Sequence, residues 1–203
     1  MGKKIMIILA AAIFVAVAAA QVPAQQVLMN SAETINKGNL KLAVFPTVLL
    51  SKNGSDSVWG VAGRFGYGLT PSLDIEAKVG FFKGLQYFGA DVEYWLIKEE
   101  NINVSAALGG HMTNYKGAGD SSGIDAALLA STKPMKKLEI YGGLMLAFDS
   151  VKNSDNNYTL AHFVPGIEYR ISDDIDFLAE VGIALNDNSR SYASVGLALY
   201  LMR

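Results

Sequence analysis

The segment Leu73-Asp74-Ile75-Glu76-Ala77-Lys78-Val79-Gly80 alternates apolar residues with polar or small ones, and its pattern occurs four times in the chain. The other copies span Ile102–Gly109, Leu138–Leu144 and Ile175–Gly182. Each copy begins with an apolar residue, continues with an acid or its amide, and keeps apolar or small residues at every second position. Because successive side chains of a strand point to opposite faces, the alternation predicts a β-strand with one apolar and one polar face.

The copies lie about thirty to forty residues apart, which leaves room for one hairpin between them. Most of the predicted strands are longer than the five or six residues typical of soluble strands. Ten strands are predicted, and they span Asn39–Leu50, Val58–Leu69, Leu73–Phe82, Leu85–Ile97, Asn101–Thr113, Ile124–Thr132, Leu138–Asp149, Thr159–Ile171, Ile175–Asn186 and Ser191–Leu201.

Three of these strands fit the pattern poorly, so a count of eight stays open. Pro46 and Pro165 lie inside predicted strands, where a proline removes a ladder hydrogen bond, and each predicts a bulge. Ile124–Thr132 alternates weakly.

The connections between the predicted strands are of two alternating kinds. Tight turns span 70–72, 98–100, 133–137 and 172–174, whereas longer loops rich in Gly, Ser, Asn and Asp span 52–57, 114–123, 150–157 and 187–190, with Lys83-Gly84 as a short exception. Outer-membrane barrels combine short periplasmic turns with longer external loops. The tight turns are therefore expected on the periplasmic side.

The N-terminal region has the pattern of a secretory signal. Lys3 and Lys4 precede an apolar stretch from Ile5 to Val17, and Ala18-Ala19-Ala20 fits a cleavage site. A second site at Val22-Pro23-Ala24 and an uncleaved anchor helix are the alternatives. We expect residues 1–20 to be a signal peptide, 21–38 a periplasmic lead-in and 39–203 an outer-membrane β-barrel.

The composition excludes several classes of protein. The 203 residues carry a formal charge of −2, no cysteine and a mean hydropathy of +0.25. The sequence has no run of basic residues that would predict binding of nucleic acid. The absence of cysteine excludes disulfides and thiolate metal sites, and no cofactor or metal site is expected.

The polar face of the strands separates a membrane barrel from a soluble sandwich. A water-facing sheet would carry dense Lys and Glu, whereas this face is sparse and rich in glycine, and the apolar face is unbroken in most strands, as hydrocarbon requires. The sequence therefore predicts an all-β fold, a closed up-and-down antiparallel transmembrane β-barrel. Its predicted lumen charge network, structural or an ion path, consists of Arg64, Asp74, Glu76, Lys78, Asp91, Glu93, Glu139, Glu168, Arg170, Asp176 and Glu180.

Tyrosines recur near the tight turns on the apolar face. Tyr67, Tyr94 and Tyr169 each lie a few residues before such a turn. Aromatic rings with a polar tip favour the membrane–water interface. These three residues are predicted to form an interface girdle.

The signal segment, the stretch Gly66–Asp74 and the last strand resemble small bacterial outer-membrane β-barrel proteins of the opacity and OmpA-barrel kind, and the resemblance covers Gly38 to Arg203. It implies a place in the outer membrane of a Gram-negative-type bacterium, with membrane lipid, lipopolysaccharide and the barrel-assembly machinery as partners. The assembly signal that the resemblance implies comprises Ser194, Gly196, Leu199 and Leu201. The family usually ends in an aromatic residue, whereas this chain ends Leu201-Met202-Arg203.

No catalytic arrangement is evident in the sequence. The chain has two histidines, His111 and His162. In the lipases and deacylases of the outer-membrane barrel class, a serine follows the histidine by two residues, whereas here Thr113 and Val164 occupy those positions. We therefore expect a non-enzymatic barrel with a structural or surface-interaction role. The alternatives are a narrow cation-preferring channel or porin, because acids exceed bases in the lumen, and a soluble periplasmic ligand-binding β-barrel.

Overall fold

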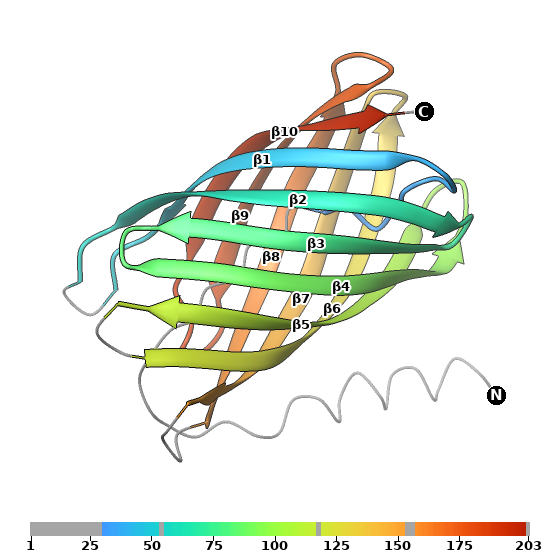
Figure 1. Cartoon of the computed structure of the whole chain (residues 1–203). Coiled ribbons are helices and arrows are strands. Elements are labelled where there is room, and N and C mark those ends of the chain that lie inside the picture. Colours follow the sequence, from blue (N-terminus) through green and yellow to red (C-terminus); the bar gives the residue numbers. More distant parts are fainter. Residues whose placement is uncertain (1–29, 53–54, 117–118, 153–156, 202–203) are drawn as a thin grey trace.

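The computed structural model describes residues 30–52, 55–116, 119–152 and 157–201, which form one barrel (Figure 1). The predicted signal peptide lies outside the described residues and stays a prediction. The ten strands are β1 (Leu40–Leu49), β2 (Val58–Thr70), β3 (Leu73–Phe82), β4 (Leu85–Lys98), β5 (Asn103–Tyr115), β6 (Gly119–Met135), β7 (Leu138–Val151), β8 (Asn157–Arg170), β9 (Ile175–Ala184) and β10 (Tyr192–Leu201).

The sheet closes because the first strand pairs with the last. β1 pairs antiparallel with β2 on one side and with β10 on the other, from Leu40 opposite Leu201 to Leu49 opposite Tyr192. Strands β2 to β9 each pair with their two neighbours in the chain, and β10 pairs with β9 as well as β1. The predicted all-β closed antiparallel barrel is confirmed, and the strand count is ten and not eight.

Two hairpins are longer than the sequence predicted. The predicted loop 114–123 is wrong, because β5 continues to Tyr115 and β6 begins at Gly119, where the two residues pair directly. At its other end β6 continues to Met135, so the turn before β7 is shorter than predicted. The ladder extends because polar side chains at the strand end also pair: Asn114 Nδ2 donates to Asp120 Oδ1 at 2.7 Å.

The predicted bulges at the two prolines are wrong. Pro46 and Pro165 interrupt the pairing of β1 with β10 and of β8 with β9, but the register is the same on both sides of each gap. Each proline stays paired with its other neighbour strand. The proline, which has no backbone N–H, therefore removes hydrogen bonds to one neighbouring strand without adding an unpaired residue to its own strand. The irregularities in register lie at Gly68/Thr70, Trp95/Ile97 and Thr132/Met135, all beside tight turns.

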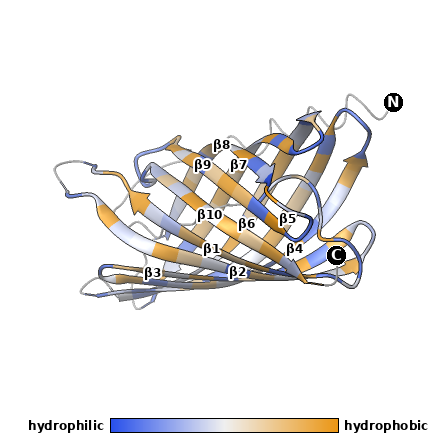
Figure 2. Ribbon diagram, turned by 90° about the horizontal axis from the view of Figure 1, so that it is seen from above, coloured by the Kyte–Doolittle hydropathy of each residue, from blue (hydrophilic) through white to orange (hydrophobic). Residues whose placement is uncertain are grey.

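The outer wall of the barrel is apolar, and apolar residues recur along each strand (Figure 2), whereas the inner wall carries most of the buried polar and charged side chains together with apolar ones. On β7 the outward residues run from Leu138 to Phe148 without a polar side chain. That stretch is about 33 Å long at 3.3 Å per residue, or about 25 Å along the axis of a strand tilted by about 40°. The apolar band thus matches the hydrocarbon height of an outer-membrane barrel. Among the described residues, no helix has the length and apolar character to cross a bilayer.

Residues 30–38, just before β1, lie inside the barrel. At Gly38, whose φ is +84°, the chain turns back into the mouth at the tight-turn end, where Gly38 N donates to Gly68 O at 2.8 Å. Asn30, Ala32 and Ile35 are buried there. We call residues 30–38 the inner segment. The predicted lead-in 21–38 did not anticipate this position, and the rest of it lies outside the described residues.

An arginine in the middle of the outer wall tests the lipid-facing assignment. Leu144 lies outward at the centre of β7, so Leu144→Arg is expected to lower the free energy of unfolding in urea by about 2–4 kcal/mol in lipid vesicles. Ile171→Arg, just beyond β8, is the control and should cost about 0–1 kcal/mol. Equal effects of the two changes would contradict the assignment.

Candidate functional site: the barrel lumen

Positively and negatively charged side chains form an alternating series of contacts along the inner face of the barrel wall. Lys41 Nζ lies 3.1 Å from Glu76 Oε1, and the other oxygen of Glu76 accepts from Arg64 Nε. Arg64 Nη2 lies 3.5 Å from Asp91 Oδ1, and Asp91 Oδ2 lies 2.6 Å from Lys78 Nζ. All five side chains are buried. Buried charges are costly unless each is paired, and here each acid faces two cations.

The chain of charges continues onto the next three strands. Lys78 Nζ lies 3.5 Å from Asp125 Oδ2. His111 then joins two carboxylates, with Nδ1 at 2.6 Å from Asp125 Oδ1 and Nε2 at 2.7 Å from Asp149 Oδ1. The Tyr87 ring stacks on the His111 ring, with 5.4 Å between centroids. We call Lys41, Arg64, Glu76, Lys78, Asp91, His111, Asp125 and Asp149 the charge chain; it links β1 through β7.

The opposite wall is filled differently. Glu180 on β9 accepts from the hydroxyls of Tyr141 at 2.9 Å and Tyr192 at 2.7 Å. The half of the lumen away from the tight turns holds an apolar cluster, whose buried members include Leu49, Phe82, Leu85, Leu129, Met145, Val164 and Tyr192. Side chains therefore occupy the interior, as expected near this barrel size.

The inner segment supplies partners to wall residues near the mouth. The Ile35 N–H donates to Asp74 Oδ2 at 2.6 Å, and Asn30 Nδ2 donates to Glu93 Oε2. Asn30 Oδ1 in turn accepts from Lys41 Nζ at 2.7 Å, which connects the segment to the charge chain.

A second set of contacts holds the middle of the inner segment. Glu33 Oε1 accepts from Asn103 Nδ2 at 3.1 Å, and Glu33 Oε2 accepts from Lys133 Nζ at 2.6 Å. These partners lie on β5 and β6, two and three strands from Asp74 on β3. The segment therefore contacts successive strands around the mouth.

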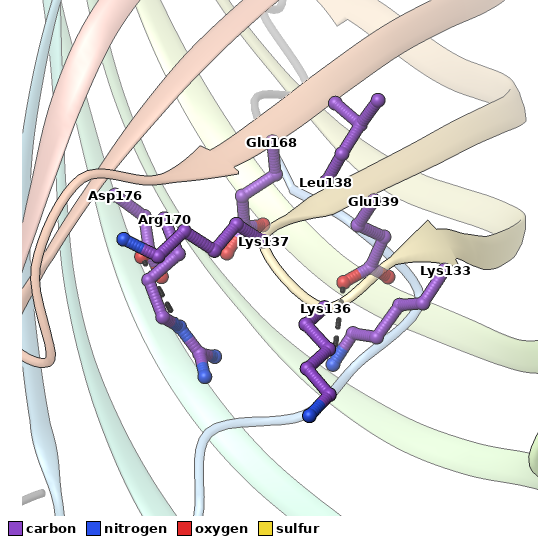
Figure 3. Close-up of a pocket in the computed structure, with 8 residues that line it drawn as sticks. All are labelled: Lys133, Lys136, Lys137, Leu138, Glu139, Glu168, Arg170 and Asp176. Carbon is purple, nitrogen blue, oxygen red and sulfur yellow. Dashed lines mark ion pairs between the residues drawn. The ribbon is translucent and has the colours of Figure 1, made fainter.

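A shallow hollow lies beside the inner segment, at the tight-turn ends of β6 to β9 (Figure 3). Lys133 Nζ lies 3.8 Å from Glu139 Oε2 there, and Arg170 Nε lies 3.7 Å from Asp176 Oδ1. Its lining residues are Lys133, Lys136, Lys137, Leu138, Glu139, Glu168, Arg170 and Asp176. Lys133 and Arg170 thus each lie close to a wall carboxylate, Glu139 and Asp176 respectively.

The eleven residues of the predicted lumen network fall into separate groups. Arg64, Glu76, Lys78 and Asp91 belong to the charge chain, whereas Asp74 and Glu93 contact the inner segment. Glu180 bonds the two tyrosines on the opposite wall. The remaining four, Glu139, Glu168, Arg170 and Asp176, line the hollow at the mouth. Whether any of them forms an ion path stays a prediction.

The predicted girdle tyrosines lie on the outer face of the barrel, and the predicted assembly residues lie on the last strand. Tyr67, Tyr94 and Tyr169 lie outward near the tight turns. On β10, Ser194 and Gly196 face inward and Leu199 and Leu201 face outward. Gly196 has a packing reason of its own, because a Cβ there would lie 2.2 Å from the Phe45 ring. The membrane and assembly roles of these residues stay predictions.

Several lumen residues were missed at the sequence level. Lys41, Asp125 and Asp149 are buried members of the charge chain. The alternation of their strands could have found them, because each lies between two outward apolar or small residues or beside one. The inner segment carries no periodic signal, and nothing in its residues predicts burial.

Both histidines are engaged inside the barrel. The two ring nitrogens of His111 face carboxylates, and Thr113 Oγ1, two residues on, hydrogen-bonds Ser121 Oγ. His162 Nε2 lies 2.9 Å from the carbonyl oxygen of Arg190. All four side chains are buried. The contacts of His111 and Thr113 join β5 to β6 and β7, whereas that of His162 joins β8 to the loop before β10.

Comparison with known proteins identifies the family. Residues 7–198 match the model of the outer membrane protein beta-barrel domain, and the chain belongs to this family. No match was found among curated protein sequences.

Solved structures with a similar fold are outer-membrane barrels. An outer membrane channel from Pseudomonas putida F1 superposes with a TM-score of 0.59 at 10% identity, covering 87% of this chain and 100% of that one. The NanC porin gives 0.50 at 10% identity, covering 79% and 100%. The translocator domain of the autotransporter NalP from Neisseria meningitidis gives 0.50 at 9% identity, covering 85% and 91%. At these identities the likeness concerns the fold alone.

A double-mutant cycle tests the charge chain. Glu76→Gln leaves Arg64 and Lys41 buried with a weaker partner, and is expected to lower the free energy of unfolding by about 3–5 kcal/mol. Arg64→Met alone should also destabilise the barrel, but the double variant should lose less than the sum, with a coupling of about 0.5–3 kcal/mol. Urea unfolding in vesicles measures both.

Glu99→Gln is the matched control for the cycle. Glu99 lies exposed in the turn after β4, and its change should fall within about 0.5 kcal/mol of zero. Strict additivity of Glu76→Gln and Arg64→Met would show that the two side chains do not act as a pair.

Proposed function

We propose that this chain is a non-enzymatic integral outer-membrane barrel with a structural or surface-interaction role and a lumen that does not conduct. The observation that carries the proposal is the filled interior. The charge chain, the apolar cluster and the inner segment together occupy the lumen from one end to the other. Family membership and the apolar outer wall support a place in the outer membrane, and the same wall argues against a soluble periplasmic carrier.

Two loops at the end away from the tight turns, β1–β2 and β9–β10, support a surface role, because hydrogen bonds hold them together. Lys52 Nζ donates to the carbonyl oxygens of Asp187 and Ser189, both at 2.7 Å. In return, Arg190 Nη2 donates to the carbonyl oxygens of Leu50 at 2.9 Å and Asp56 at 2.7 Å. A polar surface held in one shape loses little conformational entropy when a partner binds.

A narrow cation-preferring channel is the second candidate. It is favoured by the balance of buried charge: among the described residues nine acids and four Lys or Arg side chains are buried. An acidic passage would favour cations. Such a channel would have to move the side chains that now fill the lumen.

Planar-bilayer recording separates the two candidates. Purified protein is expected to insert without reproducible single-channel steps, because side chains occlude the lumen. Regular steps would reject the closed barrel. In that case Glu76→Gln with Asp176→Asn should lower the cation preference, and an unchanged reversal potential would also reject the channel lined by these acids.

A further inference from the structure

The contacts of the inner segment with the wall are mostly polar. Amide and carboxylate groups of the segment face Glu93, Lys41 and Lys133, and one backbone N–H faces Asp74. Water from the adjoining solvent can replace hydrogen bonds of this kind at a mouth. Two apolar side chains of the segment are buried: Ala32 joins the apolar cluster of the lumen, and the end of the Ile35 side chain packs over Gly66 of β2.

The barrel wall closes without the inner segment. β1 begins at Leu40, and its pairs with β2 and β10 start at that residue. The ladder between β1 and β10 therefore uses no residue before Leu40. The backbone just before it is joined to Gly68 of β2, where Gly38 N donates to Gly68 O at 2.8 Å and Asn39 O accepts from Gly68 N at 3.1 Å. The segment is held by the wall but does not build it.

One glycine of the wall marks where the inner segment sits. A Cβ added at Gly68 would lie 2.1 Å from Asn36 O and 2.4 Å from Ile35 O. Both are backbone atoms, so no side-chain rotation relieves the overlap. β2 thus accepts the segment only because residue 68 lacks a side chain.

We propose that the mouth at the tight-turn end is a binding site for an extended polar polypeptide, and that the inner segment occupies it as a tethered ligand that can leave while the barrel stays folded. Departure would uncover Asp74, Glu93 and Asn103. The apolar cluster in the other half would stay in place, so the result is a blind vestibule and not a pore. This inference goes beyond the proposed function, which concerns conduction and the outer surface.

Cysteine accessibility tests the seat of the inner segment, since the chain has no cysteine of its own. Thr34 is buried in the segment, so a Thr34→Cys variant should react slowly with a bulky maleimide in detergent. Adding Gly68→Ala should raise the rate about tenfold or more, because the open state then dominates. An unchanged rate overturns the proposal, as does rapid labelling of Thr34→Cys alone.

Two controls accompany this experiment. Gly142→Ala should leave the rate for Thr34→Cys unchanged, because a Cβ there meets only the Phe163 ring at 3.8 Å. Ser172→Cys, in an exposed turn, should react with the maleimide equally fast whether residue 68 is Gly or Ala. A shift between unboiled and boiled bands on a detergent gel identifies the folded fraction in each sample.

A deletion tests whether the segment is separable. A chain lacking residues 30–37 should still show the folded band, and its Asn103→Cys form should react rapidly, because Asn103 loses Glu33 as its cover. The synthetic peptide Asn30–Gly38 should slow that reaction in a saturable manner. Loss of the folded band, or no protection by the peptide, overturns the proposal.

Conductance of the same deletion variant distinguishes the two proposals. A blind vestibule predicts labelling without channel steps. Channel steps in this variant together with peptide protection would leave the binding site in place but show that the vestibule is not blind and that the inner segment closes the lumen. Silence without protection would overturn the binding site and leave the closed barrel in place.

Discussion

The structure depends on the pairing of every backbone N–H and C=O group in surroundings without water. A sheet in hydrocarbon has no solvent to satisfy a free edge, so the edge must be removed by closure. Here β1 and β10 meet along their length, and one registry joins them from Leu40 to Leu49. The same demand explains the prolines: Pro46 and Pro165 each leave a gap toward one neighbour only, and the register on either side holds the strands together.

The closure of the sheet and the two-residue period of side-chain direction along each strand together determine which residues line the lumen. Once the apolar residues of each strand face outward, the residues between them must share a narrow interior. Charges placed there lose their water, and they are tolerated only where each meets an opposite charge or a hydrogen-bond donor. The charge chain satisfies this condition by alternating acids and bases across seven strands, and Glu180 satisfies it with two tyrosine hydroxyls.

The alternation of apolar and polar residues therefore predicted most of the fold. The prediction failed where the structure of a segment depends on the strand that it pairs with. Ten strands and the inward position of residues such as Glu76 and Asp91 follow from the pattern along one strand. The start of β6 at Gly119 does not follow from this pattern, because glycine and aspartate are typical of loops. Pairing with β5 places them in a strand. The grouping of the acids depends on which strands are neighbours. The inner segment lacks any period, and its burial depends on the cavity that the other strands create.

The two halves of the lumen are stabilised in different ways, and this difference explains how one segment can be held and yet be separable. The apolar cluster gains from removing surface from water, which no rearrangement at the mouth can replace. The inner segment buries the side chains of Ala32 and Ile35 but otherwise gains hydrogen bonds, each worth about 0.5–1.5 kcal/mol net. Ordering its backbone costs about 1–2 kcal/mol per residue. Contacts such as Ile35 with Asp74 and Glu33 with Lys133 therefore hold the segment with little margin. The ladder of β1 bears no such cost when the segment leaves, because its bonds are made within the wall.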